Sequence, residues 1–143
     1  MANVTTGYIM ALSLYLGFAL SFALLAVVTV EMMVGAPQAS DPNTEGVNNA
    51  TNFALEQYNL MSNDARSYKL IDLIAVKTQV VAGVNYYLTM KIGATNCRKN
   101  SENLEACELA QNDEAQTRIC TFQVYSIPWK NTMSLEDSNC EAV

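Results

Sequence analysis

Residues 68–92 constrain the fold most strongly, because they hold two runs of strand-forming residues around a small-residue centre. Residues 68–78 and 84–92 are rich in valine, isoleucine, leucine and tyrosine, and Gly83 stands between the two runs. β-Branched and aromatic residues on both sides of a glycine are typical of a β-hairpin. The sequence therefore predicts two long antiparallel strands that meet close to Gly83.

The centre of this hairpin is unusually apolar for a turn. Hairpin turns commonly carry Asn-Gly or Asp-Gly, whereas residues 79–83 read Gln-Val-Val-Ala-Gly. The simpler interpretation is that the valines belong to a strand and that Gly83 marks a bulge. The alternative is that an apolar edge projects from the end of the sheet. Soluble proteins seldom leave such an edge without a partner.

One amphipathic helix is predicted before the hairpin. Asp41 is expected to cap it, Pro42 suits its first position, and Glu45 would lie in its first turn. Apolar residues then recur at helical spacing as Val47, Ala50, Phe53, Ala54, Leu55, Tyr58 and Met61. This face is expected to be core. The turn-forming residues Ser62-Asn63-Asp64 would end the helix.

Two further strands are predicted after the hairpin. Residues 118–127 alternate between apolar and polar, like a half-buried strand, and the run stops at Pro128-Trp129. Residues 133–140 form a last short strand, and residues 95–116 are polar and loop-like. One helix followed by about four strands predicts an α+β fold in which the helix covers one face of an antiparallel sheet.

The first 30 residues differ from the rest, because they contain no Asp, Glu, Lys or Arg. Residues 9–30 are almost entirely apolar, and we interpret residues 1–30 as a secretory signal peptide that is cleaved near Val28 to Val30. A retained membrane anchor is the alternative, since the run is long enough to cross a bilayer. In either case, residues 31–143 are expected to form a single domain. This domain would lie at a membrane only if the leader is retained.

The four cysteines, Cys97, Cys107, Cys120 and Cys140, do not form the close C-x-x-C pairs of a zinc or redox site. An even number behind an apolar leader predicts two disulfides in an oxidising compartment. Three pairings are compatible with the sequence. We favour the sequential one, Cys97–Cys107 with Cys120–Cys140, which closes two short loops and contributes on the order of 3 kcal/mol for each bond.

Composition excludes several functions. The chain has no histidine, which removes Ser-His-Asp and Cys-His catalysis and zinc sites built on histidine. With the cysteines paired, we expect no enzymatic activity, no metal and no cofactor. A net charge of −6 without any basic run argues against nucleic acid or anionic membranes as partners. Asn49-Ala50-Thr51 is an N-glycosylation sequon inside the predicted helix, and its use is left open.

Three motifs that are far apart in the sequence together indicate a function. Gly35 lies in an apolar trunk of residues 31–37, Gln-Val-Val-Ala-Gly in the hairpin, and Pro128-Trp129 after the third strand. In this order, and with two sequential disulfides behind the hairpin, they resemble the secreted cystatins, which are inhibitors of papain-like cysteine proteases. The five-residue motif alone would be weak evidence, but the combination over residues 33–143 is specific.

The resemblance implies a sheet of about four to five strands wrapped around one long helix. It also implies a wedge, formed by the trunk and two hairpin tips, that enters the protease cleft. The wedge would comprise Met33, Val34, Gly35, Gln79, Val80, Val81, Ala82, Gly83, Pro128 and Trp129. The apolar tip would exclude water beside the catalytic cysteine, and Trp129 would act as a rigid anchor. Ala36 stands where the family usually has a second glycine, which restricts the trunk slightly.

The resemblance also bears on Ser62-Asn63-Asp64. Some secreted cystatins inhibit legumain, which cleaves after asparagine, through such a turn; an ordinary helix-ending turn is the alternative. We therefore expect a secreted, reversible, tight-binding competitive inhibitor of papain-like proteases such as cathepsins, with legumain as a second target. The alternative function is a non-inhibitory interaction protein, secreted or membrane-anchored, on the same scaffold. Whether two copies form a domain-swapped dimer through the central hairpin is left open.

Overall fold

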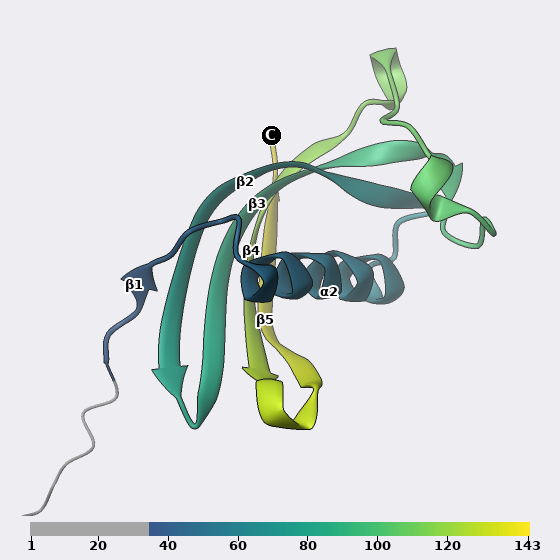
Figure 1. Cartoon of the computed structure of the whole chain (residues 1–143). Coiled ribbons are helices and arrows are strands. Elements are labelled where there is room, and N and C mark those ends of the chain that lie inside the picture. Colours follow the sequence, from purple (N-terminus) through teal and green to yellow (C-terminus); the bar gives the residue numbers. More distant parts are fainter. Residues whose placement is uncertain (1–34) are drawn as a thin grey trace, which may run out of the picture. The chain divides into compact units, whose positions relative to one another are not determined.

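The computed structural model describes residues 35–143, so Met33, Val34 and the predicted leader lie outside the described residues. These described residues form a short strand, one helix and four long strands, which Figure 1 labels. These are β1 (Gln38–Ala39), α2 (Glu45–Met61), β2 (Arg66–Val81), β3 (Gly83–Arg98), β4 (Thr117–Ile127) and β5 (Thr132–Ala142). Three single 3-10 turns occupy Leu104–Ala106, Asn112–Glu114 and Pro128–Lys130. Among these residues, no helix is both long and apolar enough to span a bilayer.

All five strands form one antiparallel sheet in the order β1-β2-β3-β4-β5. The sheet curves around α2, which lies across its inner face (Figure 1). β2 and β3 pair along their whole length, from Arg66 opposite Arg98 to Val81 opposite Gly83. Three shifts of register interrupt this pairing, and such irregularities increase the bend and twist of a strand. The predicted α+β fold is confirmed.

The core lies between α2 and the sheet. Ala50 and Ala54 have no exposed surface, and these small side chains let the helix approach the strands closely. The sheet contributes Leu88, Met90, Ile92, Phe122 and Val124 to the same cluster. The predicted helix face is correct except at Met61, which is 64 % exposed. Met61 is the last residue of α2, and periodicity alone does not show where the covering sheet stops.

The helix begins later than predicted. Thr44 is its N-cap, and the Thr44 hydroxyl accepts a hydrogen bond from the Val47 amide at 3.4 Å. Asp41 and Pro42 therefore precede the helix, and their predicted roles as cap and first residue are wrong. The Asp41 carboxylate instead accepts from the amide of Asn43 at 2.8 Å. Such a local turn competes with helix capping for the same side chain.

The polar segment after the hairpin is more ordered than predicted. β3 continues to Arg98, although only residues up to Ile92 were expected in the strand. The segment then returns along β3, where Thr95 and Leu109 form an isolated bridge. The structure contains the Cys97–Cys107 disulfide within this segment and the Cys120–Cys140 disulfide between opposite residues of β4 and β5.

Candidate functional site

The first hairpin tip, residues 79–83, turns sharply at Ala82, because Val81 already pairs with Gly83. Gly83 has a φ of +128°, a backbone conformation that residues other than glycine rarely adopt. A Cβ atom at Gly83 would also lie 2.6 Å from the carbonyl oxygen of Ser126. Gly83 is therefore needed both for the turn and for the close approach of β4. It opens β3 at the turn itself.

The apolar edge of this tip does project into solvent. Val80 is 73 % exposed and Ala82 is exposed, while Val81 is half-buried. A valine so exposed at the end of a sheet contributes nothing to the core. The second interpretation of the sequence, an apolar edge without a partner inside the described chain, is therefore the one that the structure supports.

The second tip, Pro128 and Trp129, joins β4 to β5. Pro128–Lys130 forms a single 3-10 turn, and Asn131 then adopts the left-handed conformation with a φ of 51°. Asparagine tolerates this conformation better than most residues. Trp129 is 69 % exposed, so its side chain does not belong to the core. A large rigid side chain of this kind is typical of interface anchors.

A hydrogen bond joins the first tip to β4, the strand that leads into the second tip. The hydroxyl of Tyr125 on β4 donates to the carbonyl oxygen of Ala82 in the first tip. Val84 pairs with Ser126 beside it, and both hairpin ends lie at the same end of the sheet (Figure 1). Tyr125 was not among the site residues predicted from the sequence. The only feature that could have marked it is an aromatic side chain three residues before Pro128.

The described end of the trunk, residues 35–37, is held beside the first tip. Gln38 pairs with Thr78 of β2, which places β1, directly after the trunk, antiparallel to β2. The side-chain amide of Gln79 donates to the carbonyl oxygen of Gly35 at 2.9 Å, and it accepts from the hydroxyl of Tyr87 at 3.0 Å. Gln79 thus connects all three parts: trunk, β2 and β3. Sequence reasoning missed β1 and Tyr87.

The candidate site is consequently a projecting surface. Gly35, Val80 and Trp129 belong to three separate stretches of sequence, and the fold brings these stretches to one end of the sheet. Val80 and Trp129 expose apolar side chains, and hydrogen bonds of Gln79 and Tyr125 hold the neighbouring backbone. Such an arrangement can fill a cleft on a partner with little reorganisation of its own.

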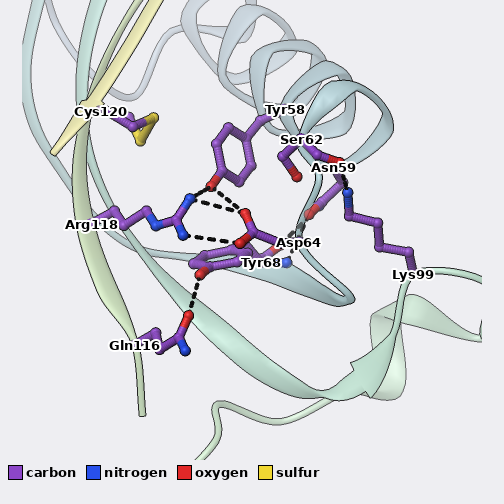
Figure 2. Close-up of polar contacts among 10 residues, drawn as sticks. Tyr58, Asn59, Ser62, Asp64, Tyr68, Lys99, Gln116, Arg118 and Cys120 are labelled. Carbon is purple, nitrogen blue, oxygen red and sulfur yellow. Dashed lines mark hydrogen bonds and ion pairs between the residues drawn. A yellow bond between two sulfur atoms is a disulfide. The ribbon is translucent and has the colours of Figure 1, made fainter. Parts of the chain in front are cut away.

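The turn of Ser62, Asn63 and Asp64, here called the Asn63 turn, forms a second candidate site (Figure 2). Asp64 makes a two-pronged ion pair with Arg118 of β4, with distances of 2.9 Å and 3.0 Å. The hydroxyl of Tyr58 also donates to the Asp64 carboxylate at 3.0 Å. Asn63 itself is exposed.

The tyrosines around this turn have altered acidity. Burial, together with the hydrogen bond to Asp64, raises the pKa of Tyr58 to about 12. Burial and the nearby charge of Asp64 also raise the pKa of Tyr68. Both phenols therefore stay protonated at neutral pH, so that Tyr58 can donate to the carboxylate.

The fold thus presents the described end of the trunk and the two tips as a projecting surface at one end of the sheet (Figure 1). Residues 35–129 match the family model of the cystatin domain. The chain belongs to the cystatin family, and it is a cystatin-type inhibitor of cysteine proteases and not an enzyme.

Individual relatives agree with this assignment. The chain is 42% identical to cystatin-C of Mus musculus over 110 residues, which cover 76% of this chain and 79% of the relative. It is 43% identical to a cystatin of Gallus gallus over 110 residues, with the same coverage of 76% and 79%. Among solved structures, dimeric human cystatin F superposes with a TM-score of 0.72 at 27% identity, covering 81% of this chain and 94% of that one. The structure of Al-CPI gives a TM-score of 0.67 at 32% identity, covering 76% and 100%.

Proposed function

We propose that the chain is a secreted, reversible, competitive and tight-binding inhibitor of papain-like cysteine proteases such as cathepsins. One observation carries the proposal: Gly35 of the trunk, the first tip and the second tip lie at one end of the sheet (Figure 1). Gln79 binds Gly35. Tyr125 of β4, the strand that leads into the second tip, binds Ala82 of the first tip. A wedge fixed in this way loses little conformational freedom when it binds.

Each part of the wedge would have its own role. Val80 and Trp129, at 73% and 69% exposure, would supply the apolar contacts that exclude water from the cleft. Gly35, held by Gln79, would direct Met33 and Val34 toward the non-primed subsites. Inhibition would follow from occupation of the cleft by a surface that presents no scissile bond to the catalytic cysteine.

Secretion is part of the proposal. The two disulfides require an oxidising compartment, and residues 1–30 are proposed as the signal peptide that delivers the chain there. Asn49 is exposed on α2, whereas Thr51 of the same sequon is only 4 % exposed. Glycosylation of Asn49 would therefore have to precede folding.

The decisive experiment is a titration of active-site-quantified papain with protein secreted from cells that express the full chain. We expect stoichiometric inhibition that substrate relieves competitively. Trp129→Ala should weaken binding by about 2 kcal/mol or more, as hot-spot substitutions do. Leu60→Ala is the matched control, because Leu60 is 70% exposed near the end of α2, away from both tips. A folded, secreted protein without inhibition at micromolar concentration would favour the non-inhibitory interaction protein.

The Asn63 turn supports a second inhibitory function against legumain. Asn63 is exposed between two residues with fixed contacts, and β2 separates this turn from the first tip. We expect Asn63→Lys to abolish inhibition of legumain and to leave inhibition of papain unchanged. Loss of both activities would show that the two sites are not independent.

We also propose that the chain can form a domain-swapped dimer through the β2–β3 hairpin, which would open so that β2 and β3 pair with strands of the other copy. The similarity to a structure of dimeric human cystatin F supports this proposal. Straightening the turn at Ala82 would let β2 and β3 separate into two copies. Because the first tip would then be lost, the dimer fraction from size-exclusion chromatography should not inhibit papain, while the monomer fraction should.

A further inference from the structure

We propose that Arg118 and Lys99 are positioning residues of the Asn63 turn. Arg118 holds the turn from β4 and Lys99 from the segment just beyond β3, so that Asn63 is presented in a fixed conformation. The partner that fits such a surface is an asparagine-specific endopeptidase. The inference rests on the proposed second function, because it assigns to that site the residues that hold it in shape.

Arg118 holds the turn on the side that follows Asn63. Its two terminal nitrogens contact the two oxygens of Asp64 at 2.9 Å and 3.0 Å, which is the paired geometry that guanidinium and carboxylate prefer. The two side chains are 28 % and 23 % exposed. The pair is therefore better shielded from water and salt than an ordinary surface ion pair.

Arg118 is itself held by two tyrosines (Figure 2). Its guanidinium carbon lies 5.0 Å from the centre of the Tyr68 ring, and one terminal nitrogen donates to the hydroxyl of Tyr58. The Tyr68 hydroxyl in turn donates to Gln116 at 2.9 Å. The rings of Tyr58 and Tyr68 meet edge to face with centroids 5.3 Å apart. The cation therefore has few alternative positions.

Lys99 holds the turn on the opposite side. Its ammonium group donates to the carbonyl oxygen of Ser62, directly before Asn63. Its backbone amide donates to the carbonyl oxygen of Ala65 at 3.2 Å. A single residue just beyond β3 thus contacts the chain both before and after Asn63.

The result is one exposed asparagine between fixed neighbours. Ser62 is bound by Lys99 and by its own amide, which donates to the Tyr58 carbonyl at 2.9 Å. Asp64 is bound by Arg118 and Tyr58. Order that already exists in the free protein does not have to be created on binding. Removal of either cationic side chain should thus weaken inhibition of legumain, although the protease would recognise Asn63 and neither of these two residues.

The experiment compares full-length wild type with Arg118→Met, Lys99→Met and the conservative Arg118→Lys. Lys91→Met on β3 is the charge-matched control, since Lys91 lies outside these contacts. Inhibition constants are measured for legumain and for papain. Hydrogen exchange of the amides at residues 62–65 is measured in parallel without protease.

We expect Arg118→Met and Lys99→Met to weaken legumain inhibition by roughly tenfold or more, the size of a lost charged hydrogen bond. Papain inhibition and Lys91→Met should stay at the wild-type level. Amides of the turn should exchange faster in the two methionine variants. Arg118→Lys should restore part of the inhibition, because it retains the charge but not the paired geometry.

Three results would overturn the inference. Wild-type inhibition of legumain by both methionine variants would show that the turn needs no support, while the second function would stand. Equal losses against papain and legumain would indicate a general defect, and Arg118→Lys would reveal this even if Arg118→Met does not fold. Failure of wild type itself to inhibit legumain would remove the second function and the positioning role together.

Discussion

The side-chain nitrogen of Gln79 lies 2.9 Å from the carbonyl oxygen of Gly35, which stands 44 residues earlier in the chain. The same side chain accepts a hydrogen bond from Tyr87. A glutamine at this position therefore does more than fill the first tip. It fixes the start of the trunk against the hairpin and so sets the shape of the wedge.

Gln79→Leu should accordingly weaken papain inhibition by several-fold. Each lost hydrogen bond contributes about 1 kcal/mol, and Gly35 would lose its bond to the Gln79 side chain, although β1 would stay paired with β2. Tyr87→Phe should have a smaller effect in the same direction, because only one of the two bonds is lost. Titration of papain measures both, with Gln57→Leu on α2 as the control substitution. Unchanged inhibition by Gln79→Leu would mean that the trunk binds without this attachment.

Gly83→Ala should destabilise the protein by about 1–3 kcal/mol, the cost of a strained backbone conformation. The added methyl group would meet the Ser126 carbonyl oxygen at 2.6 Å with φ at +128°. Gly35→Ala is the matched control, since no atom lies within 4 Å of a Cβ built at Gly35. Urea unfolding should show a lower midpoint for Gly83→Ala alone. Equal midpoints would argue that the tip relaxes freely.

Each disulfide should contribute about 3 kcal/mol to the free energy of unfolding. Cys97–Cys107 spans 10 residues and Cys120–Cys140 spans 20, so the expected contributions differ little. Paired Cys→Ser variants, one for each bond, test this by urea unfolding. The variant without Cys97–Cys107 should still inhibit papain, because that loop lies at the end of β3 far from its tip. Loss of papain inhibition in a folded variant would contradict this separation.

Tyr58 should make stability fall at alkaline pH. Its pKa is raised from 10.0 to about 12 by burial and by the hydrogen bond to Asp64, so between these values the folded protein binds a proton that the unfolded chain releases. The stabilising contribution is complete below pH 10 and is lost as pH rises toward 12. Unfolding midpoints of wild type should therefore fall more steeply above pH 10 than those of Tyr58→Phe. Parallel curves would exclude this linkage.

Much of the fold could be predicted from local patterns. The helix face follows from a period of 3.6, and the strand of residues 118–127 follows from a period of 2. The two hairpin strands follow from their β-branched and aromatic residues around Gly83. These patterns do not predict the residue at which a helix or strand begins or ends. Asp41 and Thr44 both carry a side-chain oxygen that can cap a helix. Only the geometry of the turn selects between them: Thr44 caps α2, whereas Asp41 accepts from the Asn43 amide.

The candidate sites were predicted only in part for a related reason. Exposed Val80 and Trp129 could be expected, because apolar residues at strand ends are conspicuous in the sequence. The polar contacts that hold the two candidate sites in shape could not be predicted. Tyr125 contacts Ala82 across 43 residues and Arg118 contacts Asp64 across 54, and such pairs depend on strand register and curvature. No local pattern encodes these quantities.

The uneven pairing of β2 has a consequence for association between copies of the protein. β2 has 16 residues, but within the described chain β1 covers its outer edge only at Lys77 and Thr78. Long open edges invite strands of other molecules and lead to aggregation. Here the register shifts around Leu70 and Asp72 bend the strand, and a bent edge is a poor template for a flat neighbour. At the other edge of the sheet, β5 carries Glu136, Asp137 and Glu141. Repulsion between these carboxylates would oppose the pairing of two such edges, so the sheet resists fibril-like growth at both sides.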